Sequence, residues 1–167
     1  IKDMGKIYKG FLYVGLMIKE NNPYLIEYNV RMGDPECQTI LPLLKNDFVE
    51  VLKNCMNGTL NKLELEWEDK KSICIVLASK GYPQNFNKNI FIENLENFKH
   101  SNNRFIFHAG TKLVDKKFYS TGGRVLNFVS IGSNLKSARD ETLNLIKKLN
   151  WRYGHYRRDI AFKVIKN

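Results

Sequence analysis

The sequence predicts an α+β fold that combines several short strands with one long helix. Residues 73–78 form a continuous apolar run, which is typical of a strand buried on both faces. Apolar residues recur at helical spacing over residues 134–150, which predicts a long amphipathic helix. A chain of 167 residues is long enough for one ordinary domain or two small ones.

A strand pair is expected near the start of the chain. Apolar residues predominate in residues 11–19 and again in residues 24–30. The polar segment 20–23 between them contains two asparagines and a proline, which favour a turn. Gly5 is expected to end a short helical turn that precedes the pair.

Two helices should follow the strand pair. Asp34 suits the capping position of the first helix, and Pro35 suits its first residue. Pro42 should limit or kink this helix. A second helix is expected over residues 47–56, with Gly58 as its stop.

A domain boundary is expected near residue 67, within a polar stretch. The predicted parts are therefore residues 1–66 and residues 67–167. The second part is expected to be a small mixed β-sheet domain with one long helix. Its strand candidates are residues 73–78, 104–108, 118–120 and 124–131. The apolar pattern does not decide whether residues 160–165 form a helix or a strand.

The charge balance is strongly basic, with 27 Lys and Arg against 17 Asp and Glu, a net charge of +10. A positive field attracts nucleic acids, phosphates or anionic lipids. The lysines are spread along the chain, which argues against the clustered footprint of a nucleic-acid-binding protein. The longest apolar run, residues 11–18, is too short to span a bilayer. We therefore expect no nucleic acid and no membrane as partners.

Cysteine usage favours a reducing, cytoplasmic setting. Cys37, Cys55 and Cys74 are few and scattered, and no C-x-x-C spacing occurs. The sequence carries no secretory signal pattern. It begins with Ile1, so we expect the chain to be part of a longer protein.

Polar residues alternate along the second predicted strand. Glu27, Asn29 and Arg31 share one face of a strand, because successive side chains point to opposite sides. A carboxylate and an amide oxygen two residues apart could hold Mg²⁺, which takes oxygen ligands and often keeps substrate phosphates in its shell. Arg31 could pair with those phosphate oxygens. The same pattern also fits the polar face of a half-exposed strand.

The Gly33–Asp34–Pro35–Glu36 run is a further segment that could bind a ligand. It could place a helix N-terminus near Arg31, although an ordinary capped helix start fits equally.

In the second half, Lys112 and Arg124 lie near glycines, including Gly122 and Gly123, where a backbone can approach an anion closely. A hairpin with a Gly–Gly turn and surface charges is the alternative. His108 alone is more typical of a packed or hydrogen-bonded histidine than of a catalyst.

Taken together, these segments resemble the phosphoribosylamine–glycine ligase family (glycinamide ribonucleotide synthetases). The Glu-x-Asn-x-Arg element by itself marks the wider ATP-grasp superfamily. Its extension into Gly-Asp-Pro-Glu is more specific, as are the later motifs in the same order. The resemblance rests on residues 8–17, 26–36, 81–83, 107–112, 122–126 and 157–160.

The resemblance implies a fold and an activity. Residues 1–66 would be the end of an ATP-grasp domain, and residues 67–167 the C-terminal domain of the ligase. The family ligates glycine to 5-phosphoribosylamine in purine synthesis, through a glycyl phosphate, and releases ADP and phosphate. The nucleotide clamp and the phosphate loop of the family lie upstream of these motifs. The present chain alone is therefore expected to be inactive.

The resemblance also implies roles for particular residues. Glu27 and Asn29 would hold Mg²⁺ or Mn²⁺ that bridges the ATP phosphates. Arg31 and Asp34 would be catalytic, since Arg31 would steady the phosphoryl group and Asp34 would face an amine. Substrate binding would fall to Glu36, Lys112, Gly122, Gly123 and Arg124.

Two alternatives remain open at this point. One is another ATP-grasp carboxylate–amine ligase, and the other is a basic module that binds nucleic acid. The sequence leaves the oligomeric state undetermined.

Overall fold

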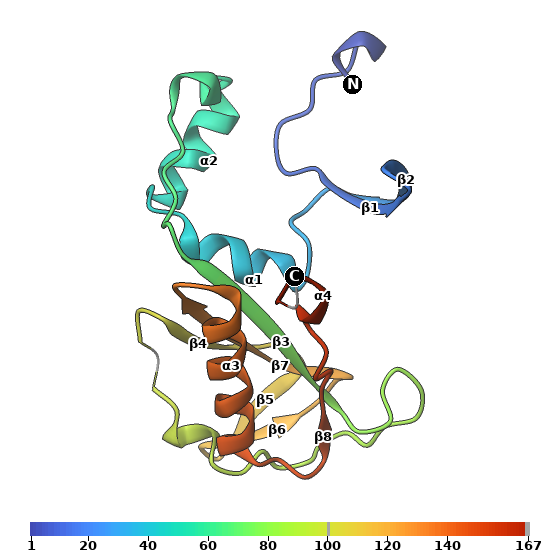
Figure 1. Ribbon diagram of the computed structural model, residues 1–167, viewed down its shortest axis with the longest axis vertical. Helices are drawn as coiled ribbons and strands as arrows, with labels where there is room; N and C mark the ends of the chain where they lie inside the picture. The colour runs from blue at the N-terminus through green and yellow to red at the C-terminus, as the bar shows by residue number, and fades with distance from the viewer. Residues whose placement is uncertain (100, 166–167) are drawn as a thin grey trace. The chain divides into compact units, whose positions relative to one another are not determined.

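The computed structural model describes residues 1–99 and 101–165 and divides into two compact units. The first unit comprises Ile1–Cys37 and Leu44–Glu68, and the second comprises Gln38–Leu43 and the chain from Asp69 onward. Helices and strands both contribute, so the predicted α+β class is confirmed (Figure 1). The boundary expected near residue 67, read as a border between family domains, stays a prediction.

The first unit contains an antiparallel hairpin of β1 (Tyr13–Lys19) and β2 (Asn22–Asn29). The expected strand pair is confirmed, but the turn is tighter than expected. Glu20 and Asn21 form it with left-handed φ angles of 51° and 63°. Two such residues in succession suit the twist of a short hairpin.

The helices that follow the hairpin come in the expected order, and a short 3₁₀ turn, η1 (Lys2–Met4), precedes the hairpin. Helix α1 (Glu36–Ile40) is followed by the 3₁₀ turn η2 (Leu41–Leu43), which contains Pro42 and ends the regular helix. Helix α2 (Phe48–Asn57) is followed by a further 3₁₀ turn, η3 (Leu60–Lys62).

One detail of the helix prediction is wrong. The first helix begins at Glu36, and Pro35 lies before it in a turn, joined to Asp34 by a cis peptide bond. Helix α2 ends as predicted, because Gly58 adopts a left-handed conformation. Asp47, expected as the first residue of this helix, instead caps it and accepts hydrogen bonds from two backbone N–H groups.

The second unit is built on an antiparallel sheet. Within its described residues, four strands pair in the order β4-β7-β3-β8. Strands β3 and β7 occupy the centre of the sheet. Six residues of each strand are buried, as their continuous apolar runs predict. The strands are β3 (Lys71–Ser79), β4 (Arg104–His108), β7 (Arg124–Gly132) and β8 (Gly154–His155).

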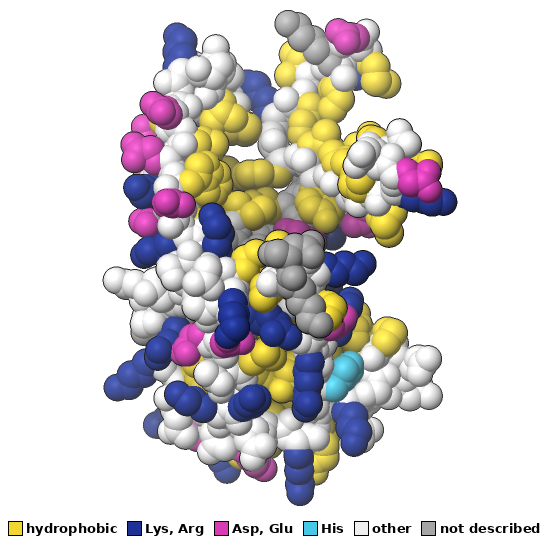
Figure 2. Space-filling model, in the orientation of Figure 1, with side chains coloured by type: hydrophobic (Ala, Val, Ile, Leu, Met, Phe, Trp, Pro, Cys, Tyr) yellow, Lys and Arg dark blue, Asp and Glu magenta, His cyan; other side chains and the backbone are white. Residues whose placement is uncertain are grey.

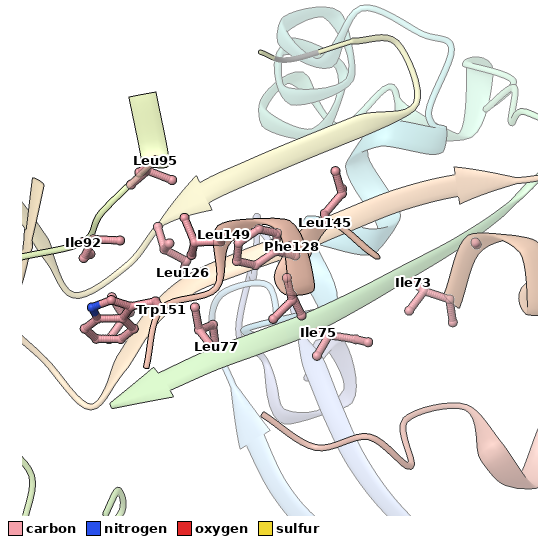
Figure 3. Packing of buried hydrophobic residues seen from close by; sticks show 13 residues of the cluster. Ile73, Ile75, Leu77, Ile92, Leu95, Leu126, Phe128, Leu145, Leu149 and Trp151 are labelled. Carbon is pink, nitrogen blue, oxygen red and sulfur yellow. The ribbon is translucent and has the colours of Figure 1, made fainter. Parts of the chain in front are cut away.

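Helix α3 (Leu135–Leu149) packs on β3 and β7 of this sheet. Its apolar stripe meets Ile75, Leu77 and Phe128 in the core, where Trp151 closes one end (Figure 3). Asn134 caps its first turn, and Asn150 ends it in a left-handed conformation. The long amphipathic helix predicted over residues 134–150 is confirmed.

A second hairpin, β5 (Thr111–Val114) with β6 (Lys117–Ser120), was expected only in part. Its turn is formed by Asp115 and Lys116, both with positive φ. Gly122 and Gly123 are therefore not a hairpin turn, because they connect β6 to β7 instead. The remaining elements are the 3₁₀ turn η4 (Leu95–Asn97) and helix α4 (Phe162–Ile165), which assigns a type to the segment left open.

None of the helices in the described residues combines the length and the apolar run that a membrane crossing requires. The three cysteines, all of them described, form no disulfide. On the face seen in Figure 2, Lys and Arg side chains are distributed widely over the second unit.

Candidate functional site

One face of the first hairpin carries the acidic and amide side chains that the sequence predicts as metal ligands. Asn29 donates from its Nδ2 atom to Oε1 of Glu27 over 2.9 Å. In the register, Gly15 lies opposite Glu27 and Tyr13 lies opposite Asn29. Directly opposed residues in an antiparallel pair share a face. Gly15 matters here because a Cβ at this position would lie 3.1 Å from Cγ of Glu27.

The chemistry of this pair fits a hard divalent cation. Because the amide nitrogen of Asn29 satisfies one carboxylate oxygen, its own oxygen and the second oxygen of Glu27 are left as ligands. Among the described residues, no group of three His, Cys, Asp or Glu side chains is arranged to hold a metal. A cation at Glu27 and Asn29 would therefore need oxygens from a substrate or from water to fill its shell, as Mg²⁺ commonly does.

Glu36 reaches the same hairpin from the start of helix α1. Its Oε1 atom accepts a hydrogen bond from the Tyr13 hydroxyl at 3.2 Å. Its Oε2 atom lies against buried Gly33, where an added Cβ would stand only 2.3 Å away. The negative charge of Glu36 is the largest cause that raises the pKa of Tyr13, and the charge of Glu27 adds to it.

Tyr13 was missed by the sequence reasoning. Alternation along one strand shows which side chains share its face, but the partner strand's register decides which residue stands opposite. That register is set by the tight turn at Glu20 and Asn21, which the sequence pattern had placed over four residues.

The other two residues predicted near the metal pair lie in the segment after β2. The strand ends at Asn29, so strand alternation does not carry Arg31 onto the shared face as expected. Its guanidinium Nη1 donates to the carbonyl of Met32 at 2.9 Å. Asp34 is exposed in the turn before α1. Burial raises the pKa of the Cys37 thiol, and the charge of Asp34 raises it further.

The second predicted cluster is assembled by two loops of the other unit. The backbone N–H of Gly110 donates to the Arg124 carbonyl at 2.9 Å, and the N–H of Thr121 donates to the Gly110 carbonyl at 2.7 Å. A Cβ at Gly110 would lie 2.7 Å from Cα of Gly122, so the close approach requires glycine. The Arg124 side chain is exposed next to this contact in the chain, and Lys112, two residues after Gly110, is also exposed.

Gly123 has a packing role in the structure. A Cβ at this position would lie 2.0 Å from the ring of Tyr82, so the tyrosine covers the space where a side chain would be. The carbonyl groups of Gly122 and Gly123 accept hydrogen bonds from the Ser79 side chain and backbone, at 2.9 Å and 2.7 Å. These contacts fix the loop that leads into Arg124.

His108 is exposed, and it is the hydrogen-bonded histidine that was one of the two expectations for it. Its Nδ1 atom lies 2.8 Å from Oγ1 of Thr111, and its ring centroid lies 4.7 Å from that of Phe118. It also lines a cavity of about 210 Å³ whose walls include Ile106 and Arg104. The predicted site residues thus form two groups, Glu27 to Glu36 in the first unit and Lys112 to Arg124 in the second.

Comparison with known proteins matches the segments that contain these two groups to one described family. The model of the phosphoribosylglycinamide synthetase ATP-grasp (A) domain matches residues 1–37, and that of the phosphoribosylglycinamide synthetase C domain matches residues 72–163. Residues 38–71 lie between the two matches, so their assignment to the ATP-grasp domain stays a prediction.

Similar proteins carry consistent names. A phosphoribosylamine–glycine ligase of Caldanaerobacter subterraneus is 45% identical over 96% of this chain and 38% of its own length. The trifunctional purine biosynthetic protein adenosine-3 of Gallus gallus is 40% identical over 95% of this chain and 16% of its own length. The crystal structure of phosphoribosylamine–glycine ligase from Thermotoga maritima is similar, with a TM-score of 0.77 and 35% identity over 95% of this chain and 38% of that one.

These matches place the chain among the ATP-grasp ligases, and they favour neither a different superfamily member nor a nucleic-acid-binding module. Because the C-domain match covers more than half of its residues, the chain belongs to the phosphoribosylglycinamide synthetase family. It spans about 38% of the length of the bacterial relatives described above.

Proposed function

We propose that this chain forms the C-terminal part of a phosphoribosylamine–glycine ligase, an enzyme of de novo purine biosynthesis. Such an enzyme consumes ATP to join glycine to 5-phosphoribosylamine, giving glycinamide ribonucleotide, ADP and phosphate. The observation that carries the proposal is the order of the two family matches, with the ATP-grasp match at residues 1–37 and the C-domain match at residues 72–163.

The surface of the first hairpin supports its membership of a larger domain. An isolated two-stranded hairpin is marginally stable in water. Here the hairpin exposes large apolar side chains on both faces. Figure 2 shows in yellow those on the side in view. They include Leu16, Met17, Ile18, Tyr24, Ile26 and Tyr28, each at least 49% exposed. A domain that covers both faces would bury them and stabilise the pair.

The first step of the reaction would occur at the hairpin's polar face. A glycine carboxylate oxygen attacks the γ-phosphorus of ATP, which gives glycyl phosphate and releases ADP. Glu27 and Asn29 would hold a divalent cation, Mg²⁺ or Mn²⁺, that neutralises phosphate charge when bound. Arg31 would turn its guanidinium toward the transferred group, because phosphoryl transfer depends on positioning and charge stabilisation.

In the second step the amine of phosphoribosylamine attacks the acyl carbon of glycyl phosphate, and inorganic phosphate leaves. Asp34 and Glu36 would face the amine groups of the substrates, because their carboxylates are negatively charged. Both lie within three residues of Gly33. Lys112 and Arg124, held beside Gly110 and Gly122, would bind the phosphate at the far end of the sugar.

The proposal includes the setting of the enzyme. Three cysteines that form no disulfide fit a reducing compartment, so we expect the ligase in the cytoplasm with small molecules as its partners.

The test uses the complete ligase that we propose contains this chain. Purified protein is incubated with ATP, Mg²⁺, glycine and freshly prepared phosphoribosylamine, and both ADP and glycinamide ribonucleotide are quantified. We expect ADP and product in equal amounts, dependent on both substrates. ADP release with a different carboxylate or amine, and none with this pair, would contradict the proposal. A fusion of this chain to the first part of the Caldanaerobacter ligase provides a second preparation for the same assay.

A further inference from the structure

We propose that Tyr13 is a positioning residue of this ligase, whose hydroxyl holds the Glu36 carboxylate beside the Glu27–Asn29 pair. The inference rests on the proposed function, and it assigns a role to a residue outside the predicted site. It is carried by three contacts within the first unit, which join Tyr13 to Glu36, Tyr13 to Asn29, and Glu36 to Gly33.

The first contact is the hydrogen bond between the Tyr13 hydroxyl and Oε1 of Glu36, at 3.2 Å. The two residues are 23 positions apart, so this bond joins the hairpin to the start of helix α1. The second contact is the pairing of Tyr13 with Asn29 across the hairpin. Because opposed residues share a face, the phenol lies on the side that carries the metal pair. Tyr13 therefore links Glu36 to that side.

The third contact involves Gly33, which is buried. A Cβ built on Gly33 would stand 2.3 Å from Oε2 of Glu36 and 2.9 Å from Cε2 of Tyr13. The carboxylate thus occupies space that a side chain at position 33 would need. Gly33 is not among the glycines with positive φ, so alanine can adopt its backbone conformation. Gly33→Ala would therefore act by displacing the carboxylate rather than by straining the backbone.

This arrangement has a direct consequence for binding. A glutamate side chain on a short helix has several accessible rotamers, and fixing one of them on substrate binding costs entropy. In this structure Tyr13 and Gly33 fix the rotamer before the substrate arrives, which favours binding of an amine at Glu36. Loss of either contact should weaken binding of an amine substrate and leave ATP binding unchanged.

The test begins with Tyr13→Phe in the complete ligase, which removes the hydroxyl and keeps the ring. Loss of one hydrogen bond to a charged group should raise the KM for glycine or phosphoribosylamine about tenfold. The KM for ATP should stay within about twofold, because Tyr13 makes no contact assigned to the nucleotide. Gly33→Ala should act in the same direction. Tyr24→Phe removes the hydroxyl of another hairpin tyrosine, one that has no assigned role in the site, so it is the matched control and should change neither constant.

A double-mutant cycle separates positioning from a general structural effect. In a Glu36→Ala background, Tyr13→Phe should cause no further change, because the group it positions is gone. An equal loss in both backgrounds, or a parallel rise in the KM for ATP, would overturn the inference while leaving the proposed function intact. Absence of glycine-dependent turnover in the unsubstituted ligase would instead overturn the proposed function, and this inference with it.

Discussion

The side-chain amide of Asn29 donates to the carboxylate of Glu27 across 2.9 Å on one face of a two-stranded hairpin. This bond joins the Asn29 amide to the Glu27 carboxylate two residues away on the same strand. Both residues are polar groups on a strand with exposed surroundings, so neither contributes to a packed core. Their arrangement has a ready explanation in ligand binding and none in the burial of apolar surface.

Glu27→Gln in the complete ligase is expected to lower kcat by about 10²–10³, because it removes one charged contact to the phosphate-bound cation. Thermal stability should be unchanged. The measurement is ADP release over a titration of Mg²⁺. Glu20→Gln, in the hairpin turn, is the matched control and should keep full activity. Wild-type turnover by Glu27→Gln at saturating Mg²⁺ would exclude Glu27 as a ligand.

Arg124→Ala should raise the KM for phosphoribosylamine roughly 10–150-fold and leave the KM for ATP nearly unchanged, since a charge-assisted hydrogen bond to an anion is lost. Initial rates with each substrate varied in turn provide both constants. Lys148→Ala removes an exposed cation from helix α3 of the same unit and should alter neither. A rise confined to the KM for ATP would reassign Arg124 to the nucleotide.

The 167-residue chain assayed alone should release no ADP above background with ATP, Mg²⁺, glycine and phosphoribosylamine. It spans about 38% of its bacterial relatives, and the ATP-grasp match covers residues 1–37. Phosphoryl transfer needs a clamp on the nucleotide in addition to a metal pair. Glycine-dependent turnover by this chain would show that its own residues complete the nucleotide site.

Asn134→Ala should destabilise the chain by about 1 kcal/mol, because the Asn134 side chain accepts a hydrogen bond from the backbone N–H of Ser137 at 2.8 Å. Urea unfolding followed by circular dichroism measures the change. Asn144→Ala places the same substitution at an exposed position within α3, where alanine favours the helix, and should be neutral or stabilising. Equal losses from both substitutions would contradict the capping role.

The carboxyl of Asp140 should titrate below its ordinary value of 3.8, because the hydrogen bond and charge of Lys136 lower its pKa. A depressed pKa means that the contribution to stability is complete above pH 3.8 and is lost as the pH falls through the lower, folded-state value. Carboxyl-detected NMR titration measures this pKa directly. Lys136→Ala should move it upward, and an unchanged value would show that the ion pair does not persist in solution.

Local patterns were sufficient for most secondary structure. The apolar run at residues 73–78 and the periodic helix at residues 134–150 both describe elements whose side chains meet one core, so pattern and burial agree. The glycine stop was equally informative, as Gly58 shows, because a helix end is decided by the few residues around it. The pattern was wrong about Pro35, which precedes helix α1, and missed strand β5 in the second unit.

Part of the candidate site could be predicted from the sequence. The spacing of Glu27 and Asn29 was enough to place both on one face, since alternation is a property of a single strand. Sequence by itself therefore determined the fold class, the principal elements and the strand face that Glu27 and Asn29 share. Tyr13 could not be found in this way, because its role depends on the register with Asn29 and on the approach of Glu36 to Gly33. Only the tertiary structure decided these contacts, because pairing across strands and packing against a glycine depend on residues that are distant in the chain.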